Sequence, residues 1–212
     1  MIETIPPEII VETLSPLISD ARKEKIDRIL ENRLSSIQIA IERPYDPYNG
    51  LAIIRTGEAM GIFNYHLIAT EYKRRRRVTS GSDRWVNIKN YTDLESYKPT
   101  TILAGAAIEG AIPLSEVPID RPITLVFGNE HTGLTKDALA KCDLTYAIPM
   151  FGMAESYNLS VSAALSLHTL AEKRRAYLGT TGDLTPEEKM RERANAYIRT
   201  LKERSARLIL SR

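Results

Sequence analysis

Hydrophobic and polar residues change their spacing several times along this chain of 212 residues. In about the first 35 residues, apolar positions recur at helical spacing between charged ones, and Ser15-Pro16 is expected to break the segment into two short helices. From Ile37 to Ile41 every second residue is isoleucine, and this alternation predicts a strand beginning at about Ser36.

The central region alternates between the two patterns. Further strands are predicted at Tyr65–Ala69, Thr101–Ala106, Ile123–Phe127 and Leu144–Ile148, and helices at Leu51–Met60, Thr135–Lys141 and Tyr157–Tyr177. Strands that alternate with helices indicate an α/β fold with a mostly parallel sheet. A last helix is predicted to begin at Thr185-Pro-Glu-Glu188, which has the form of a capping box.

These patterns divide the chain into three regions. We expect a helical N-terminal extension at residues 1–35, an α/β core at 36–177 and a basic helical C-terminal extension at 178–212. The amphipathic second helix of the N-terminal extension is expected to pack either on the core or on a partner subunit.

Composition excludes several classes of protein. One cysteine rules out an intrachain disulfide framework, and three scattered histidines argue against a structural zinc site, so no metal is expected. No apolar run approaches the ~20 residues of a membrane helix, and no secretory signal is visible. These features predict a cytoplasmic protein without a membrane partner.

The net charge of +2 is unevenly distributed. Residues 1–43 carry 6 basic and 8 acidic groups, residues 44–170 carry 12 and 13, and residues 171–212 carry 11 and 6, so the last segment alone has a net charge of +5. A basic tail suggests a polyanionic partner. The run Lys73-Arg74-Arg75-Arg76-Arg77 is either a solvated loop or a patch that contacts phosphate.

Three segments have the character of a chemical site. The first runs from Asn49 to Glu58, where Asn49 could cap a helix and Arg55 could pair with Glu58 on its surface. Arg55 follows two isoleucines in a short apolar helix, and an arginine in that position usually has a defined anionic partner. A cap with a surface ion pair is the structural alternative.

The second segment, Phe127-Gly-Asn-Glu130-His-Thr-Gly133-Leu-Thr-Lys136, connects a strand to a helix. Ligand-binding loops of α/β proteins occupy this position. The segment lacks the Gly-Lys-Ser/Thr of a phosphate-binding loop and the Gly-x-Gly-x-x-Gly of dinucleotide folds. Glu130 suits a hydroxyl, an amino group or an arginine better than a phosphate. An ordinary glycine-containing turn is the alternative.

The third segment runs from Ile148 to Ser162 and joins a strand to a Ser/Asn-rich helix start. Small and polar residues at a helix entrance offer backbone N–H groups to a ligand. A simple capped helix with Ser156 as the cap is the alternative, although it does not explain the Pro-Met-Phe-Gly-Met loop.

Taken together and in this order, the three segments resemble the TrmH (SpoU) family of SPOUT-class RNA methyltransferases, over roughly residues 36–175. The segment from Thr79 to Val86, which contains the sole tryptophan, Trp85, resembles a loop of the tRNA-specific members. The short helical extensions point to the same subgroup, the tRNA guanosine-2′-O-methyltransferases.

The resemblance implies a SPOUT-like α/β fold with a deep trefoil knot, S-adenosylmethionine as cofactor, tRNA as substrate and a homodimer. Positions that match the catalytic site are Asn49, Arg55, Glu130, Ser156 and Asn158. Positions that match the cofactor site are Ala104, Gly105, Gly128, Ile148, Met150 and Tyr157. RNA contacts are expected from Lys73, Arg74, Arg75, Arg76, Arg77, Arg84, Arg174 and Arg175. The chain departs from the family pattern at Gly50, where a larger residue is usual, and at Tyr157, where leucine is usual.

The leading hypothesis is therefore methylation of the D-loop guanosine at tRNA position 18. In this hypothesis Arg55 activates the ribose hydroxyl, either as the base itself or by holding the adjacent phosphate so that the phosphate or a water accepts the proton. The second version is physically easier, because arginine normally stays protonated. The alternatives are the same chemistry on ribosomal RNA, a catalytically silent RNA-binding protein of this fold, and a structural dimerisation protein.

Overall fold

The computed structural model describes residues 4–70, 79–97, 99–108 and 110–211. The basic run Lys73–Arg77 lies outside these residues. The chain forms two compact units, one made of residues 34–180 and the other of residues 1–33 together with 181–212. From the sequence we expect a separate extension at each end of the chain, whereas in the structure the two ends belong to a single helical unit.

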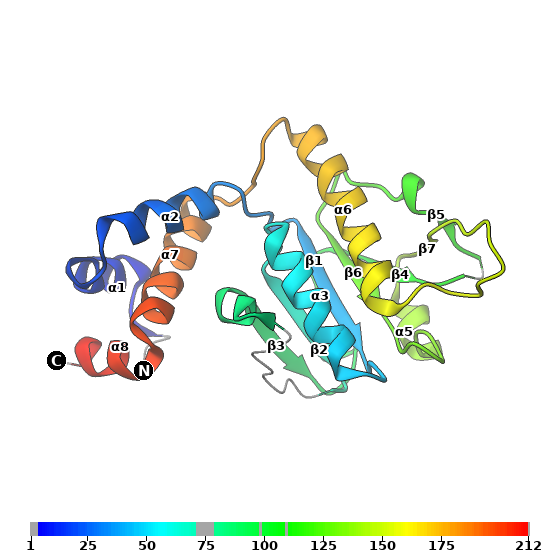
Figure 1. Cartoon of the computed structure of the whole chain (residues 1–212), viewed down its shortest axis with the longest axis horizontal. Coiled ribbons are helices and arrows are strands. Elements are labelled where there is room, and N and C mark those ends of the chain that lie inside the picture. Colours follow the sequence, from blue (N-terminus) through cyan, green and yellow to red (C-terminus); the bar gives the residue numbers. More distant parts are fainter. Residues whose placement is uncertain (1–3, 71–78, 98, 109, 212) are drawn as a thin grey trace. The chain divides into compact units, whose positions relative to one another are not determined.

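The larger unit is built on a sheet of seven parallel strands (Figure 1). The strand order is β3-β2-β1-β6-β4-β7-β5. In chain order, the strands are β1 (Ile37–Glu42), β2 (Asn64–Ile68), β3 (Asn87–Tyr91), β4 (Ile102–Ala106), β5 (Ile112–Pro113), β6 (Ile123–Phe127) and β7 (Leu144–Ala147). The predicted α/β class with a mostly parallel sheet is confirmed, and all five predicted strands are present.

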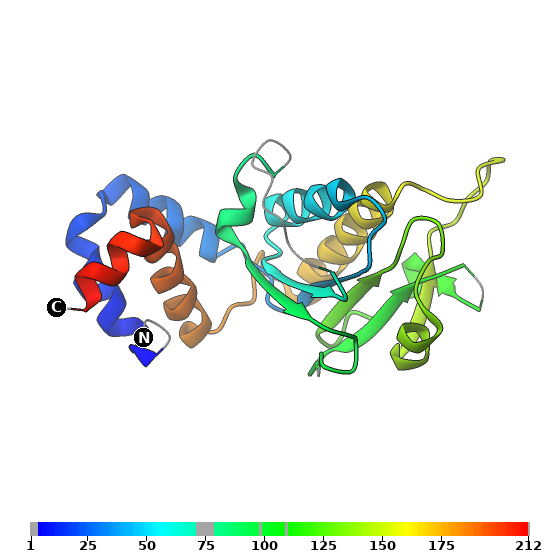
Figure 2. The ribbon, with the colours of Figure 1, turned by 90° about the horizontal axis from the view of Figure 1, so that it is seen from below.

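Helices cover both faces of this sheet. Figure 2 shows α3 (Pro47–Ala59) and α6 (Leu159–Leu178) on one face and the short α5 (Lys136–Lys141) on the other. The central strand β6 is buried along its whole length, as expected where both faces of a parallel sheet are covered. Two 3₁₀ turns, η3 (Ser82–Trp85) and η4 (Leu114–Glu116), complete the unit, and η3 packs against α3.

Helix α3 approaches the sheet closely because of one glycine. A Cβ at Gly57 would lie 2.3 Å from the hydroxyl oxygen of Tyr65 on β2, so no larger residue fits without movement. That buried hydroxyl donates to the carbonyl oxygens of Ile54 (3.1 Å) and Ile62 (3.2 Å). Gly57 and Tyr65 therefore fix the height of α3 over β2, and with it the position of the helix start where the candidate site lies.

The helical unit contains both ends of the chain. Its elements are α1 (Pro7–Leu14), η2 (Ser15–Leu17), α2 (Asp20–Leu30), α7 (Pro186–Leu201) and α8 (Glu203–Leu210). The predicted break at Ser15-Pro16 and the capping box between Thr185 and Glu188 are both confirmed. Between α2 and α7, Arg193 Nε lies 2.8 Å from Asp27 Oδ1. One positive charge of the basic tail is therefore paired with a carboxylate inside the helical unit.

None of the helices in the described ranges is long and apolar enough to cross a membrane. Within the same ranges, no group of three or more His, Cys, Asp and Glu side chains is placed to hold a metal ion.

Candidate active site

The three segments singled out from the sequence all lie beyond the carboxyl ends of parallel strands. The first segment lies within α3, the helix that follows β1, the second follows β6, and the third connects β7 to α6. In the sheet, β6 lies between β1 and β4, and β7 lies beyond β4. The carboxyl edge of such a sheet is where α/β proteins bind ligands.

Glu130, in the loop after β6, accepts hydrogen bonds from the segment after β1. Its Oε1 accepts from Asn49 Nδ2 at 2.7 Å and from the Asp46 backbone N–H at 3.3 Å. Its Oε2 accepts from the Tyr45 backbone N–H at 2.6 Å. Partial burial raises the pKa of the Glu130 carboxyl, but these hydrogen bonds and one from its own backbone outweigh it, so the pKa lies below its ordinary value. Glu130 is therefore an anion at neutral pH.

Asn158 extends this network to the start of α6. Its Nδ2 donates to Asn49 Oδ1 at 3.2 Å. Its Oδ1 accepts from the backbone N–H groups of Ser160 (2.9 Å) and Val161 (3.4 Å) and from the Ser160 hydroxyl (2.7 Å). Asn158 is thus the N-cap of α6, and the cap fixes which end of its amide faces Asn49.

These contacts exclude the two helix caps that the structural alternatives for Asn49 and Ser156 required. Helix α3 begins at Pro47 with Asp46 as its cap, because the Asp46 carboxylate accepts from the Tyr48 backbone N–H at 2.8 Å. Asn49 consequently lies inside the first turn, where its side chain reaches Glu130. Helix α6 is capped by Asn158, and Ser156 lies in the exposed loop before it.

The loop after β6 is held in a tight hairpin. Asn129 and Gly133 exchange backbone hydrogen bonds of 2.9 and 2.8 Å. A Cβ at Gly128 would lie 2.4 Å from the Gly133 backbone, so this crossing of two backbone segments requires glycine. The rigid hairpin presents Glu130 toward α3.

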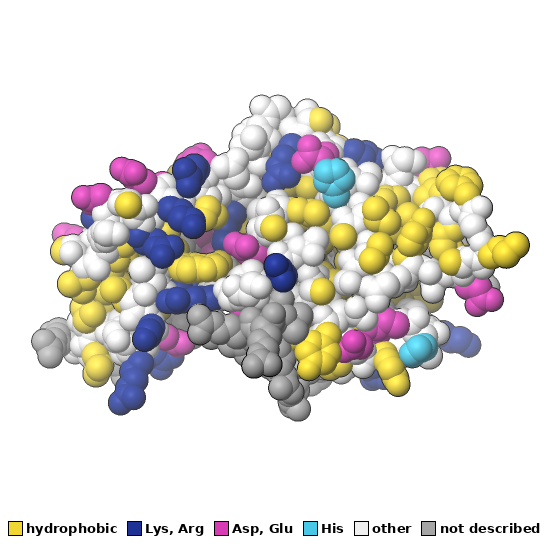
Figure 3. All heavy atoms as spheres, in the orientation of Figure 1, with side chains coloured by type: hydrophobic (Ala, Val, Ile, Leu, Met, Phe, Trp, Pro, Cys, Tyr) yellow, Lys and Arg dark blue, Asp and Glu magenta, His cyan; other side chains and the backbone are white. Residues whose placement is uncertain are grey.

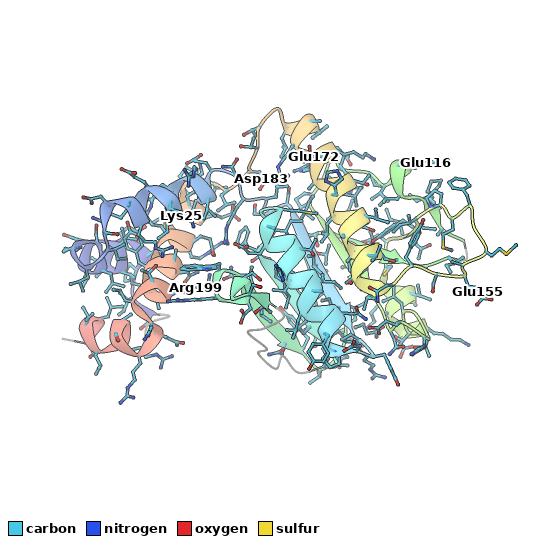
Figure 4. The ribbon with its side chains drawn as sticks, viewed as in Figure 1. Lys25, Glu116, Glu155, Glu172, Asp183 and Arg199 are labelled. Atoms are coloured by element: carbon cyan, nitrogen blue, oxygen red, sulfur yellow. The ribbon has the colours of Figure 1, made fainter. Side chains whose placement is uncertain are left out.

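A cleft of about 590 Å³ opens beside this loop. Its walls come from the ends of β4, β6 and β7, from the loop after β7 and from the first turns of α6. The lining residues are 106–108, 127–134, Leu139, 146–148, Met150, 155–157, Leu159 and Ser162. Figure 4 labels one of them, Glu155, in the loop between β7 and α6.

The cleft fits the cofactor that the family resemblance implies. Apolar side chains such as Ile148 and Met150, together with exposed loop backbone, suit an adenine ring. Two carboxylates, Glu130 and Glu155, also line the cleft and suit the positive charge of a sulfonium.

Four of the six expected cofactor residues line this cleft, namely Gly128, Ile148, Met150 and Tyr157. The other two, Ala104 and Gly105, do not line the cleft, and their contact with the cofactor stays a prediction. Both are buried inside β4, where a Cβ on Gly105 would lie 2.9 Å from Cys142 Sγ, and the cleft is lined instead by the next residues, 106–108. Those residues are nearer the carboxyl end of the strand, where the sheet meets the loops.

The expected catalytic residues divide into two groups. Asn49, Glu130 and Asn158 are joined by the hydrogen bonds above. Ser156 lines the cleft, and Arg55 lies six residues beyond Asn49 on α3 with an exposed side chain. The structure therefore brings three of the five into one network, and their catalytic roles stay predictions.

Three of the arginines that are expected to contact RNA make contacts within the protein. Arg84 is half-buried, with its guanidinium carbon 5.1 Å from the centre of the Trp85 ring. Arg174 is buried and donates to Ser36 Oγ and the Ile119 carbonyl, and Arg175 donates to the Met60 carbonyl at 2.7 Å. Both guanidinium groups tie α6 to neighbouring segments, and RNA contacts from Arg174 and Arg175 stay predictions.

Sequence reasoning missed the backbone donors of Tyr45 and Asp46, which supply two of the hydrogen bonds to Glu130. Backbone groups leave no direct mark in a sequence. The Asp46-Pro47 pair was nevertheless a usable signal, because a capping residue followed by proline is typical of a helix start.

Comparisons with known proteins agree with this site. Residues 36–168 match the model of the family described as the SpoU rRNA Methylase family. A tRNA (guanosine(18)-2′-O)-methyltransferase of Borreliella burgdorferi is 31% identical over 173 residues, which are 78% of this chain and 79% of that protein. A 23S rRNA (guanosine-2′-O-)-methyltransferase of Acinetobacter baylyi is 28% identical over 163 residues, which are 72% and 66% of the two chains.

Among solved structures, the A. aeolicus TrmH/SpoU tRNA modifying enzyme superposes with a TM-score of 0.74 at 26% identity. The match covers 84% of this chain and 96% of that one. The family that the motifs resemble is thereby confirmed. This chain belongs to the SpoU methylase family of S-adenosylmethionine-dependent RNA 2′-O-methyltransferases.

Proposed function

We propose that this protein methylates the ribose 2′-hydroxyl of the D-loop guanosine at position 18 of tRNA. The observation that carries the proposal is the continuous set of hydrogen bonds from Glu130 through Asn49 to Asn158 at the edge of the cleft. A polar network beside a cofactor-sized cleft suits a reaction in which a hydroxyl must be aligned. The relative that is named for this substrate covers most of the chain.

In this proposal the network orients groups and transfers no proton itself. Glu130 is anionic and fixed by at least three donors, so it holds Asn49 and the loop entering α3 in one position. Asn49 and Asn158 then present amide groups of known orientation toward a bound ribose. Alignment of two reacting atoms is a large part of what such a site contributes to the rate.

Arg55 is proposed to bind the phosphate next to the reacting ribose. Its exposed position on α3 leaves the side chain accessible to RNA. A guanidinium stays protonated at neutral pH and binds phosphate through two parallel N–H groups. The phosphate or a water molecule, held in this way, accepts the proton that leaves the 2′-hydroxyl.

The cofactor contributes an electrophilic methyl group on a sulfonium. The residues proposed to hold it are Gly128, Ile148, Met150 and Tyr157, together with residues 106–108. Tyr157 is half-exposed, and its hydroxyl donates to the Pro149 carbonyl at 3.3 Å, which folds the phenol ring back over its own loop. The departure from leucine at this position therefore also adds a contact within the loop.

A second copy of the chain is the proposed partner of the exposed apolar surface near the cleft. Phe151 is 98% exposed and Met153 is fully exposed, and Val161 and Leu165 lie one turn apart on α6 with exposed side chains. Figure 3 shows hydrophobic side chains gathered over α6 and the loop before it. Sedimentation equilibrium tests this proposal, because Leu165→Glu should convert a dimer into a monomer.

Incubation with labelled S-adenosylmethionine tests the substrate. Unmodified tRNA and 23S ribosomal RNA are compared at equal concentration, and faster incorporation into tRNA supports the proposal. Faster incorporation into ribosomal RNA favours the alternative that the 28% identical Acinetobacter relative represents. RNA binding without incorporation into either favours a catalytically silent protein.

A further inference from the structure

Two aromatic rings stand exposed beside the Glu130 network. Tyr45 is 70% exposed, His131 is exposed as well, and their ring centres lie 4.5 Å apart with an angle of 81° between the rings. In this edge-to-face arrangement, neither ring covers both faces of the other. Open aromatic surface is thus available to a further planar group.

Isolated exposed aromatic residues are common and need no explanation. This pair is different because the protein fixes the backbone of both rings through one side chain. Asn129 Nδ2 donates to the Arg43 carbonyl at 3.0 Å, two residues before Tyr45, and Asn129 Oδ1 accepts from the His131 backbone N–H at 2.9 Å. The two ring-bearing segments, 86 residues apart in the sequence, are therefore held against each other.

The segment that carries Tyr45 is also held in an unusual conformation. Arg43 has a φ of 43°, in the left-handed region that residues other than glycine seldom adopt. Pro44 follows it and restricts the chain further. This turn directs the Tyr45 backbone N–H to Glu130, so the ring position and the catalytic network depend on the same turn.

The location determines what the rings can contact. Tyr45 donates through its backbone to the same carboxylate that Asn49 contacts, and His131 lines the cleft. A nucleotide whose ribose lies at Asn49 and Glu130 has its base attached directly to that ribose. Bases in single-stranded RNA loops are commonly bound by stacking on aromatic rings.

We propose that the Tyr45–His131 pair is a stacking platform for the base of the nucleotide that is methylated, and that it sets the position of its ribose at the network. The inference rests on the proposed function, since it assumes an RNA nucleotide at this site. Stacking on an aromatic ring is worth about 1–3 kcal/mol per base, which corresponds to roughly 5- to 150-fold in affinity. Every base has a π face, so the platform positions the base and leaves discrimination of guanine to other contacts.

The test is a double-mutant cycle across the interface, read by RNA binding. The protein change is Tyr45→Ala, and the RNA change replaces the base of nucleotide 18 with hydrogen while keeping its 2′-hydroxyl. For intact tRNA, Tyr45→Ala should weaken binding about tenfold, and Tyr45→Phe should restore it. For the abasic tRNA, wild type and Tyr45→Ala should bind equally, because the stacked base is already gone.

His131→Ala should behave in the same way as Tyr45→Ala. The matched control is Tyr177→Ala, which removes an exposed aromatic side chain on α6.

Two results would overturn the inference. One is an equal loss of affinity from Tyr45→Ala on intact and abasic tRNA, which places the ring elsewhere on the RNA. The other is a change from dimer to monomer in Tyr45→Ala, which makes the pair a subunit contact. Methyl incorporation is measured in parallel on wild type. Binding that depends on Tyr45 and base 18 but gives no methylation leaves the stacking in place and contradicts the proposed function alone.

Discussion

The side-chain amide of Asn49 donates a 2.7 Å hydrogen bond to the Glu130 carboxylate, although 81 residues separate the two along the chain. This contact joins the start of α3 to the loop after β6, and Asn158 adds the start of α6. One network thus connects the segments that follow three strands. Substitution of any member should therefore alter the arrangement of side chains at the edge of the cleft.

Glu130→Gln tests the role of the anionic acceptor. The substitution keeps the shape but replaces one oxygen with an amide donor, which then faces a donor on Asn49 or on the Tyr45 backbone. An unmatched donor costs about 1–3 kcal/mol, so kcat/KM should fall roughly 5- to 150-fold. Glu116→Gln, at an exposed glutamate in η4 (Figure 4), is the control and should match wild type. Full activity in Glu130→Gln would remove the carboxylate from the mechanism.

Asn158 has two functions that two substitutions separate. Asn158→Asp keeps the oxygen that caps α6 but removes the donor to Asn49, so thermal stability should hold while activity falls about 10-fold or more. Asn158→Ala removes both and should also lose about 1 kcal/mol of stability. Thermal melts and initial rates on the same preparations check this pattern. If Asn158→Asp is as active as wild type, the residue is only a helix cap.

Arg55→Lys tests whether the forked guanidinium is needed. Lysine keeps the positive charge at this exposed position, so the melting temperature should change by no more than a few degrees. A lysine keeps the charge but cannot bind a phosphate through two parallel N–H groups, and kcat should fall about 100-fold. Arg121→Lys, at another exposed arginine, is the matched control. Near-normal turnover in Arg55→Lys contradicts the proposed role.

Stability should depend on pH through His66 of β2. The ring is buried, its Nε2 lies 2.7 Å from Gln38 Oε1, and its Nδ1 is buried without a hydrogen-bond partner. Burial, and to a smaller extent the charge of Lys89 on β3, lower the pKa of His66 from 6.5 to about 4. The neutral ring stacks on Tyr97 with the ring centres 4.2 Å apart.

Between pH 4 and 6.5 the unfolded chain holds more protons at this histidine than the folded protein does. The free energy of unfolding therefore rises with pH across that window, by up to about 3 kcal/mol, and the contribution is fully present above pH 6.5. Urea unfolding at several pH values measures it. His66→Gln should give a flatter profile than wild type in this window, and parallel profiles would show that His66 does not titrate on unfolding.

The sequence predicted the elements that follow strong local rules. Strands β1 and β6 are rich in β-branched residues, and α7 begins with a capping box. Strand β3 escaped notice because Asn87-Ile-Lys-Asn-Tyr91 is polar and lies at a sheet edge, where it has a neighbour on one side only. Strand β5 was not predicted either, because it has only two residues and ends in proline.

The site was predicted as a set of residue types, and the family resemblance supplied their roles. What could not be predicted is how they are held. The Tyr45 and Asp46 contributions come from backbone N–H groups, and the burial of Arg174 depends on contacts with Ser36, 138 residues away. The union of both chain ends in one helical unit is likewise a long-range property, which local patterns do not encode.

Mapping the methylated nucleotide tests whether the protein modifies the ribose of guanosine 18. Unmodified tRNA and the same tRNA with 2′-deoxyguanosine at position 18 are each incubated with the protein and labelled S-adenosylmethionine, and the products are digested and analysed by mass spectrometry. The proposed function predicts up to one methyl group per tRNA, on the ribose of guanosine 18, and none on the deoxy substrate. Equal incorporation into both substrates, or a methyl group on a base, would contradict it.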